Sequence, residues 1–240
     1  MFDLLAPTCV LCDVVVDERV ENKVTNISLC NDCYHDLPWL EHACKQCGVA
    51  CKDCGVHSPV CGACQKKPPF VDYTLAALHY VSPVDYLVTE LKFRKQLTSA
   101  AIMSELLCRF LEVQLSQDIG PGKPDLIIPV PLHKNRLRLR GFNQAVELAK
   151  PLARRFSIPM DKHSVSRTKN TAPQSDLDAA QRKKNILNSF QIENRDQLLQ
   201  ASHVVILDDV VTTGATCNEL ARLLKKTGVQ KVGVWSVARA

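Results

Sequence analysis

Apolar and polar residues alternate in blocks along most of the chain, and the blocks predict strands and helices in turn. Four short apolar runs predict buried strands, at residues 74–81, 125–130, 203–207 and 231–237. Apolar residues at helical spacing predict helices over 84–95, 100–115 and 145–152, and a fourth that contains 219–226 and ends at 227–228. Strands that alternate with helices predict an α/β domain with a mostly parallel sheet.

This pattern begins only after a polar, basic segment with two adjacent prolines, Gln65 to Phe70. Such a composition is typical of a boundary between domains. We therefore expect a small N-terminal module at residues 1–68 and a larger α/β domain at 69–240. A chain of 240 residues is long enough for such a pair.

The N-terminal segment contains ten of the 12 cysteines of the chain. They form five C-x-x-C pairs, namely Cys9/Cys12, Cys30/Cys33, Cys44/Cys47, Cys51/Cys54 and Cys61/Cys64. Two such turns can surround one zinc ion tetrahedrally, and the spacing of the first two pairs is typical of a zinc ribbon. Because a module this short buries little apolar surface, we expect bound zinc to provide its folding energy.

Ten thiols exceed the needs of two four-ligand sites, so one pair is surplus. We expect one zinc at Cys9, Cys12, Cys30 and Cys33, and a second at Cys44, Cys47, Cys61 and Cys64. Cys51 and Cys54 are either alternative ligands of the second site or spare. A cross-braced arrangement, in which the first and third pairs share a metal, also stays open.

Composition excludes several other classes of protein. The chain is 46% hydrophobic and 23% charged, as in ordinary globular proteins. No apolar run reaches the roughly 18 residues of a membrane span. The first seven residues lack the basic segment and apolar core of a secretion signal. We therefore expect a cytoplasmic location, where cysteine clusters bind metal rather than form disulfides.

Candidate chemistry is concentrated at residues 204–216, Val-Val-Ile-Leu-Asp-Asp-Val-Val-Thr-Thr-Gly-Ala-Thr. The apolar strand delivers Asp208 and Asp209 to its carboxyl end, where α/β sheets bind ligands. Paired acids there can accept hydrogen bonds from the vicinal hydroxyls of a ribose. The hydroxyl-rich loop that follows opens a helix, whose first N–H groups suit a phosphate. The segment predicts a sugar-phosphate site; the alternative is a capped helix start, with Thr213 as N-cap and solvated acids.

Residues 204–216 resemble the motif by which type I phosphoribosyltransferases bind phosphoribosyl pyrophosphate (PRPP). The resemblance implies that Asp208 and Asp209 bind the ribose hydroxyls. It also implies that the 5′-phosphate is bound by Val211, Thr212, Thr213, Gly214, Ala215 and Thr216.

Nearly the whole chain is similar to the ComF family (ComFC/GntX-like proteins). The similarity rests on the C-x-x-C pairs, Leu91-Lys-Phe93, Pro129-Val-Pro131, residues 136–144, Arg167-Thr168, Gln174 and residues 182–185. It implies a type I phosphoribosyltransferase-like parallel sheet flanked by helices, preceded by a small Cys-rich zinc module. It also implies a link to natural competence, the uptake and use of external DNA. The surplus pair Cys51/Cys54 departs from the four-pair pattern of the family.

Charge is distributed unevenly, because residues 130–186 carry +9 in a chain of net charge +5. The resemblance implies that the loop after Pro131 contacts pyrophosphate, which makes Arg136 and Arg140 candidates for bidentate contacts with the leaving group. It also implies that residues 164–185 form a loop that closes over the site. The alternatives are a single-stranded DNA groove and a solvated surface. Lys92 is either a cation that reaches the PRPP site or a surface lysine.

We therefore expect an enzyme that binds PRPP with Mg²⁺ and transfers ribose-phosphate to a nitrogen nucleophile. Its expected catalytic residues are Asp208, Asp209, Arg136 and Arg140. Two other functions stay open. One is a non-catalytic accessory that binds single-stranded DNA and works with other competence proteins. The other is a regulator that senses PRPP or a nucleotide without turnover.

Overall fold

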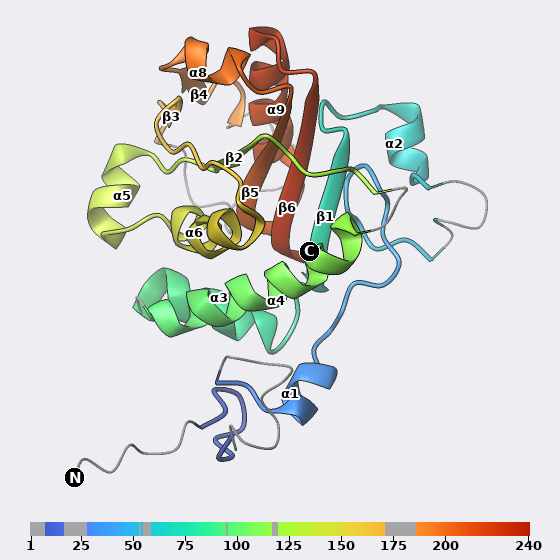
Figure 1. The fold of residues 1–240 in the computed structure, drawn as a ribbon, viewed down its shortest axis with the longest axis vertical. Coiled ribbons are helices and arrows are strands. Elements are labelled where there is room, and N and C mark those ends of the chain that lie inside the picture. The colour runs from blue at the N-terminus through green and yellow to red at the C-terminus, as the bar shows by residue number, and fades with distance from the viewer. Residues whose placement is uncertain are drawn as a thin grey trace.

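Four parallel strands form the central sheet of the computed structural model (Figure 1). Residues 8–16, 28–52, 54, 59–94, 96–116, 120–170 and 186–240 are described. The strands lie in the order β1 (Tyr73–His79), β6 (Lys231–Arg239), β5 (His203–Val211) and β2 (Leu126–Pro129). All three pairings are parallel. The predicted α/β class and all four predicted strands are confirmed.

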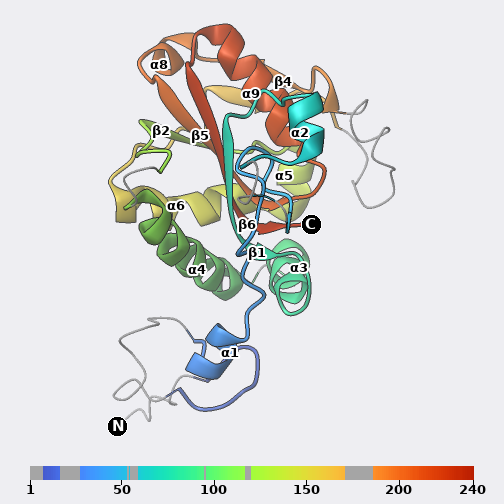
Figure 2. The same cartoon turned by 90° about the vertical axis from the view of Figure 1, so that its right-hand side faces the viewer.

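Helices cover both faces of this sheet. Helices α3 (Val84–Arg94), α4 (Leu97–Leu115) and α6 (Gln144–Phe156) lie on one face, and α9 (Ala215–Thr227) lies on the other (Figure 2). Side chains alternate along β5, so that Val205 and Leu207 join the core beneath α3, α4 and α6. Val204 and Ile206 join the core beneath α9. Because β5 is buried on both faces, its sequence is a continuous apolar run rather than an alternation of apolar and polar residues.

The N-terminal residues pack along the outer edge of β1. Hydrogen bonds run from Leu40 N to Ala77 O (2.9 Å), from Thr74 N to Lys45 O (2.9 Å) and from His79 N to Pro38 O (2.8 Å). This segment contains the short helices α1 (Asn31–His35) and α2 (Gly62–Lys66). It covers an edge that would otherwise expose unpaired backbone groups. The division of the chain at residue 68 stays a prediction.

Residues 134–140 form a helix, α5 (Lys134–Arg140), rather than the loop implied by the resemblance. The helix begins after His133, whose ring accepts a hydrogen bond from Asn135 N, and it ends at Gly141 in the left-handed conformation (φ 85°). Local capping therefore outweighs the alternation of charge and leucine.

The sequence patterns also missed the short helices α1 and α2, two short strands and a third short helix. The strands β3 (Val165–Arg167) and β4 (Phe190–Ile192) form an antiparallel pair, and α8 (Arg195–Leu199) follows them. Most of the predicted closing loop, residues 171–185 with Gln174 and 182–185, lies outside the described residues. None of the helices in the described part of the chain is long and apolar enough to span a membrane.

Candidate functional site

The two adjacent acids lie near the carboxyl end of β5, in different environments. Asp209 is 3% exposed, whereas Asp208 is half-buried and accepts a hydrogen bond from Asp209 N at 3.0 Å. Burial and the neighbouring charge of Asp209 raise the pKa of Asp208 well above its usual range. Two carboxyl groups of the same type therefore have different proton affinities.

Lys92 explains this difference, because its Nζ forms an ion pair with Oδ2 of Asp209. Burial alone would raise the pKa of Asp209, but the charge and hydrogen bond of Lys92 lower it instead. The lysine comes from the last turn of α3. Lys92 is therefore not a free surface lysine but a cation that reaches the acid pair.

Two arginines, Arg140 and Arg167, interact electrostatically with the acid pair, and a third, Arg136, interacts with both of them. Burial lowers the pKa of Arg140, while the charge of Asp209 raises it and that of Arg136 lowers it. Burial likewise lowers the pKa of Arg167, which also senses the charges of Arg136 and Asp208. Arg140 Nη1 donates to Gln144 Oε1 at 2.5 Å. The predicted residue Arg140 therefore lies within the electrostatic field of Asp209, whereas the predicted residue Arg136 lies near Arg140 and Arg167.

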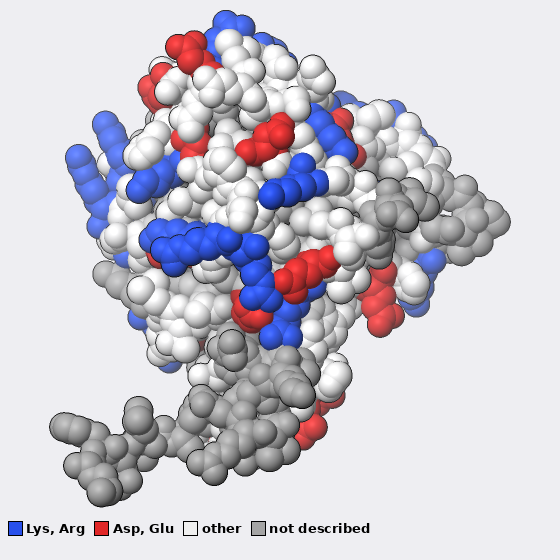
Figure 3. Space-filling view, in the orientation of Figure 1, with Lys and Arg blue, Asp and Glu red and all other residues white. Residues whose placement is uncertain are grey.

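Helix α5 divides its four cations between two faces. Arg136 and Arg140, four residues apart, are partly buried, whereas Lys134 and Arg138, also four apart, are exposed. Figure 3 shows Lys and Arg at the edge of the molecule formed by α5, while acidic groups are interspersed with basic ones across the centre of the view. Because the inner and outer pairs are separate, one helix can present cations to two different anions.

The loop after β5 turns tightly into α9. Gly214 has φ 72°, and a Cβ there would meet nothing closer than 3.9 Å, so its conformation rather than crowding requires glycine. Gly214 is the N-cap, and the hydroxyl of Thr213 accepts a hydrogen bond from Ala215 N at 3.4 Å. A shallow cavity is lined by Asp208 and by residues 210–217. The loop therefore brings together all six residues predicted to bind the 5′-phosphate, at the N-terminus of a 13-residue helix.

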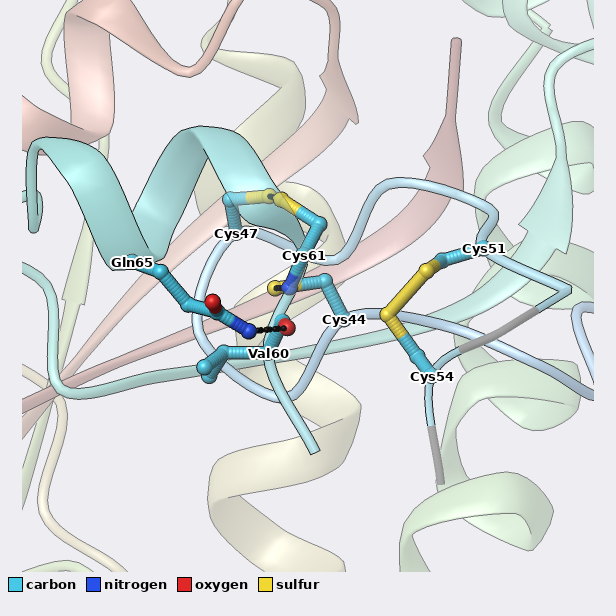
Figure 4. The surroundings of a disulfide bond; sticks show 7 residues. All are labelled: Cys44, Cys47, Cys51, Cys54, Val60, Cys61 and Gln65. Atoms are coloured by element: carbon cyan, nitrogen blue, oxygen red, sulfur yellow. Dashed lines mark hydrogen bonds between the residues drawn. A yellow bond between two sulfur atoms is a disulfide. The ribbon is translucent and has the colours of Figure 1, made fainter. Parts of the chain in front are cut away.

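The eight predicted zinc ligands form two separate clusters. The first contains Cys9, Cys12, Cys30 and Cys33, and the second contains Cys44, Cys47, Cys61 and Cys64; the sulfur atoms of each lie within 4.8 Å of one another. Cys51 and Cys54 are joined by a disulfide (Figure 4). The expectation that these cysteines bind metal rather than form disulfides is therefore wrong for this pair, and the two are not alternative ligands. The first and third pairs lie in different clusters, which is inconsistent with the cross-braced arrangement.

Both clusters can hold a metal ion that prefers thiolate ligands. Burial raises the pKa of Cys9 and of Cys44, but backbone N–H groups outweigh it and lower each pKa to about 7. One of these donors is Cys61 N, which lies 3.2 Å from the Cys44 sulfur. One thiol in each cluster therefore favours the thiolate form, whereas the pKa values of Cys30, Cys33, Cys47 and Cys64 are raised. Tetrahedral sites of four sulfurs suit Zn²⁺.

Sequence patterns missed Arg239 at the end of β6. Its side chain is 9% exposed and donates to backbone oxygens of Cys47 (3.0 Å), Val211 (3.1 Å) and Thr212. The signal that could have found it is a single cation at the carboxyl end of an apolar strand. Nothing in the sequence alone indicates that this strand pairs with β5.

The chain is similar to a phosphoribosyl transferase domain family and to proteins named for DNA utilization and competence. The family described as Phosphoribosyl transferase domain matches residues 99–240. The DNA utilization protein YhgH of Escherichia coli strain K12 is 38% identical over 212 residues, which are 88% of this chain and 90% of that protein. Competence protein F of Haemophilus influenzae is 35% identical over 213 residues, again 88% and 90%.

Similarity to solved structures is weaker. The glutamine PRPP amidotransferase of B. subtilis, complexed with ADP and GMP, gives a TM-score of 0.36 at 15% identity. The match covers 57% of this chain and 25% of that chain.

Proposed function

Because the chain belongs to the family of competence and DNA-utilization proteins that carry a phosphoribosyl transferase domain, we propose that it binds PRPP with Mg²⁺. We further propose that it transfers the ribose 5-phosphate of PRPP to a nitrogen nucleophile. One observation carries the proposal: at one end of the sheet, an acid pair lies within the electrostatic reach of Arg140 and Arg167 and is followed by a helix N-terminus. Each group matches one part of PRPP, namely its ribose hydroxyls, its pyrophosphate and its 5′-phosphate.

In the proposed reaction, the acceptor nitrogen forms a bond to C1 of the ribose while the bond from C1 to the pyrophosphate oxygen breaks. Pyrophosphate leaves with the electron pair, and the nitrogen releases its proton to solvent. Positive charge accumulates on the ribose ring in the transition state. Asp209, held ionised by Lys92, and Asp208 would stabilise that charge and accept hydrogen bonds from the hydroxyls.

The leaving group carries the opposite charge. Arg136 and Arg140 would bind its oxygens in bidentate fashion, while the N–H groups at the start of α9 hold the 5′-phosphate. Mg²⁺, when bound with PRPP, would be held beside Asp208 and Asp209 and would offset negative charge on the leaving group. Catalysis would then rest on positioning and electrostatics.

Calorimetric titration with PRPP and Mg²⁺ tests this proposal. We expect saturable binding by the wild type, and at least tenfold weaker binding by Asp208→Asn and by Asp209→Asn. Asp196→Asn, a change at an exposed acid of α8, is the matched control. Absence of heat with the wild type, or equal affinity in the two site variants, would contradict PRPP binding. Release of pyrophosphate on adding candidate amines then distinguishes a transferase from a regulator that only senses PRPP.

We further propose that both cysteine clusters bind structural Zn²⁺, and that the protein works in the cytoplasm. The support for zinc is the tetrathiolate composition of each cluster. The support for the compartment is that the eight cluster cysteines are free thiols, as metal ligands must be, although Cys51 and Cys54 form a disulfide.

A second function, binding of single-stranded DNA, is favoured by the outer face of α5 and by the names of the relatives. Lys134 and Arg138 are exposed there, and Leu139 is 86% exposed beside them. The double change Lys134→Ala/Arg138→Ala should weaken binding of a fluorescent oligonucleotide and reduce its salt dependence. Arg136→Ala/Arg140→Ala should instead weaken PRPP binding. Salt-independent or absent DNA binding by the wild type would exclude this function.

A further inference from the structure

The buried guanidinium of Arg239 lies between the second cysteine cluster and the phosphate loop. Its Nε donates to the carbonyl oxygen of Cys47 at 3.0 Å. Its Nη1 donates to Val211 O at 3.1 Å and also to Thr212 O. One side chain therefore joins a cluster cysteine to two successive residues of the loop, although 192 positions separate Arg239 from Cys47.

The geometry of the peptide bond gives these contacts a consequence on the other side of the loop. In a trans peptide, the C=O of one residue and the N–H of the next point in opposite directions. When Arg239 fixes the carbonyls of Val211 and Thr212, the N–H groups of Thr212 and Thr213 must point away from the guanidinium. Both residues line the shallow cavity at the start of α9.

The cluster end of this connection is held by its own contacts. Cys47 belongs to the cysteine group that can hold a metal, and its neighbour Gln46 accepts a hydrogen bond from Thr74 Oγ1 at 2.8 Å. Gly48 N donates to Cys44 O at 2.8 Å, which closes the turn between the two ligands. A metal that holds Cys44 and Cys47 together would therefore also fix the carbonyl that Arg239 binds.

We propose that Arg239 is a positioning residue, which uses the second cysteine cluster as an anchor to orient two backbone N–H groups of the phosphate loop. The proposal rests on the proposed function, because it takes the 5′-phosphate of PRPP as the ligand of those groups. It adds a dependence that the proposed function does not contain. Metal loss from the second cluster weakens phosphate binding, whereas metal loss from the first cluster does not.

The first cluster offers an internal comparison. Its Cys9 and Cys30 are buried and belong to the same hydrophobic cluster as residues of α3 and α4. Within the described ranges, no hydrogen bond joins this cluster to residues 211–216. Each cluster consists of four cysteines, so the two clusters offer a metal the same ligand type and differ in their connection to the loop.

The experiment measures two quantities on the full chain: affinity for PRPP with Mg²⁺, and hydrogen exchange of the amides of residues 212–214. We expect Arg239→Met and Arg239→Lys to weaken PRPP binding about tenfold and to speed exchange of these amides by at least as much. Lysine keeps the charge but lacks the planar fork that reaches separate carbonyls. Arg154→Ala, at an exposed arginine of α6, is the control and should change neither quantity.

The link to the cluster is tested with Cys61→Ser in the second cluster and Cys12→Ser in the first. We expect only Cys61→Ser to reproduce the effect of Arg239→Met. In the Arg239→Met background, Cys61→Ser should add nothing, because both changes break one connection. Equal effects of the two cysteine changes, or additive effects of Cys61→Ser and Arg239→Met, would overturn the link.

The two proposals fail in different ways. If the wild type binds no PRPP, the proposed function is wrong, while the hydrogen-exchange comparison still tests Arg239. If the wild type binds PRPP and the Arg239 variants bind it equally well with unchanged exchange, the positioning role is wrong and the proposed function stands. Thermal unfolding of each variant distinguishes faster exchange of the loop from faster exchange of the whole domain.

Discussion

Adjacent residues of one type play different roles at the acid pair of β5. Asp209 is paired with Lys92, so its carboxylate remains ionised although it is buried. Lys92 also lowers the pKa of Asp208, but burial and the charge of Asp209 outweigh it and raise that pKa well above the usual carboxyl range. A site that must bind a positively charged transition state thus stores unfavourable electrostatic energy when empty.

This stored energy predicts that Asp208→Asn stabilises the free protein. Because the folded pKa of Asp208 is raised, its contribution lowers stability as pH rises from the ordinary carboxyl value of about 4. We expect asparagine to raise stability by about 1 kcal/mol at pH 8 and to change it little at pH 4. Thermal unfolding at both pH values measures this, with Asp196→Asn as control. A loss of stability at pH 8 would contradict the electrostatic interpretation.

Replacement of Lys92 should change the free energy of unfolding in the opposite direction. Lys92→Met leaves Asp209 buried without its cation, which should cost about 3 kcal/mol of unfolding free energy at pH 7. Because the folded pKa of Asp209 is lowered by Lys92, the stabilisation is present above the ordinary carboxyl pKa and disappears as pH falls below it. Denaturant unfolding from pH 3 to 8 should show a loss that shrinks at low pH. Lys92→Arg, which keeps the charge, should retain most of the stability.

At the scale of elements, the sequence predicts what depends on local burial. The strands at 126–129 and 231–239 and the helix at 84–94 match their apolar patterns within a few residues. The three-residue strands β3 and β4 have no such pattern, because so few positions carry no periodicity.

The candidate site shows the same limit. Asp208, Asp209 and the loop to Thr216 were predictable, since they are contiguous in sequence. Lys92 and Arg239 complete the site from distant elements, and their contacts depend on sheet order. Contacts that depend on the order of strands in the sheet cannot be predicted from the residues next to them in the sequence.

The pairing of β1 with β6 supplies a prediction of its own. Tyr73 lies directly against Gly233, where an added Cβ would come within 2.1 Å of the tyrosine ring. Because the tyrosine is buried and its hydroxyl lies 2.9 Å from His203 Nε2, it has little room to move. We expect Gly233→Ala to lower the unfolding free energy by about 2–3 kcal/mol. The double variant Gly233→Ala/Tyr73→Leu should recover part of the loss if the clash is the cause.

At the scale of the whole molecule, metal content is the simplest prediction. Two clusters of four cysteines predict two Zn²⁺ per chain in freshly purified protein, measured by elemental analysis. A strong chelator should lower the unfolding temperature, because binding free energy at such sites is folding free energy. Fewer than one zinc per chain would contradict the assignment. Cys108→Ser, at a buried cysteine outside the clusters, should leave the zinc content unchanged.

The strand order also determines when the sheet can form during synthesis. Tyr73 on β1 pairs with Gly233 on β6, which is synthesised 160 positions later. At a translation rate of about 5–20 residues per second, that interval is on the order of ten to thirty seconds. Among the described residues, the segment around Leu40 and Lys45 hydrogen-bonds to the opposite, outer edge of β1. During this interval the cysteine-rich segment can therefore cover one edge of β1, while the edge that pairs with β6 stays open until the last strand has been made.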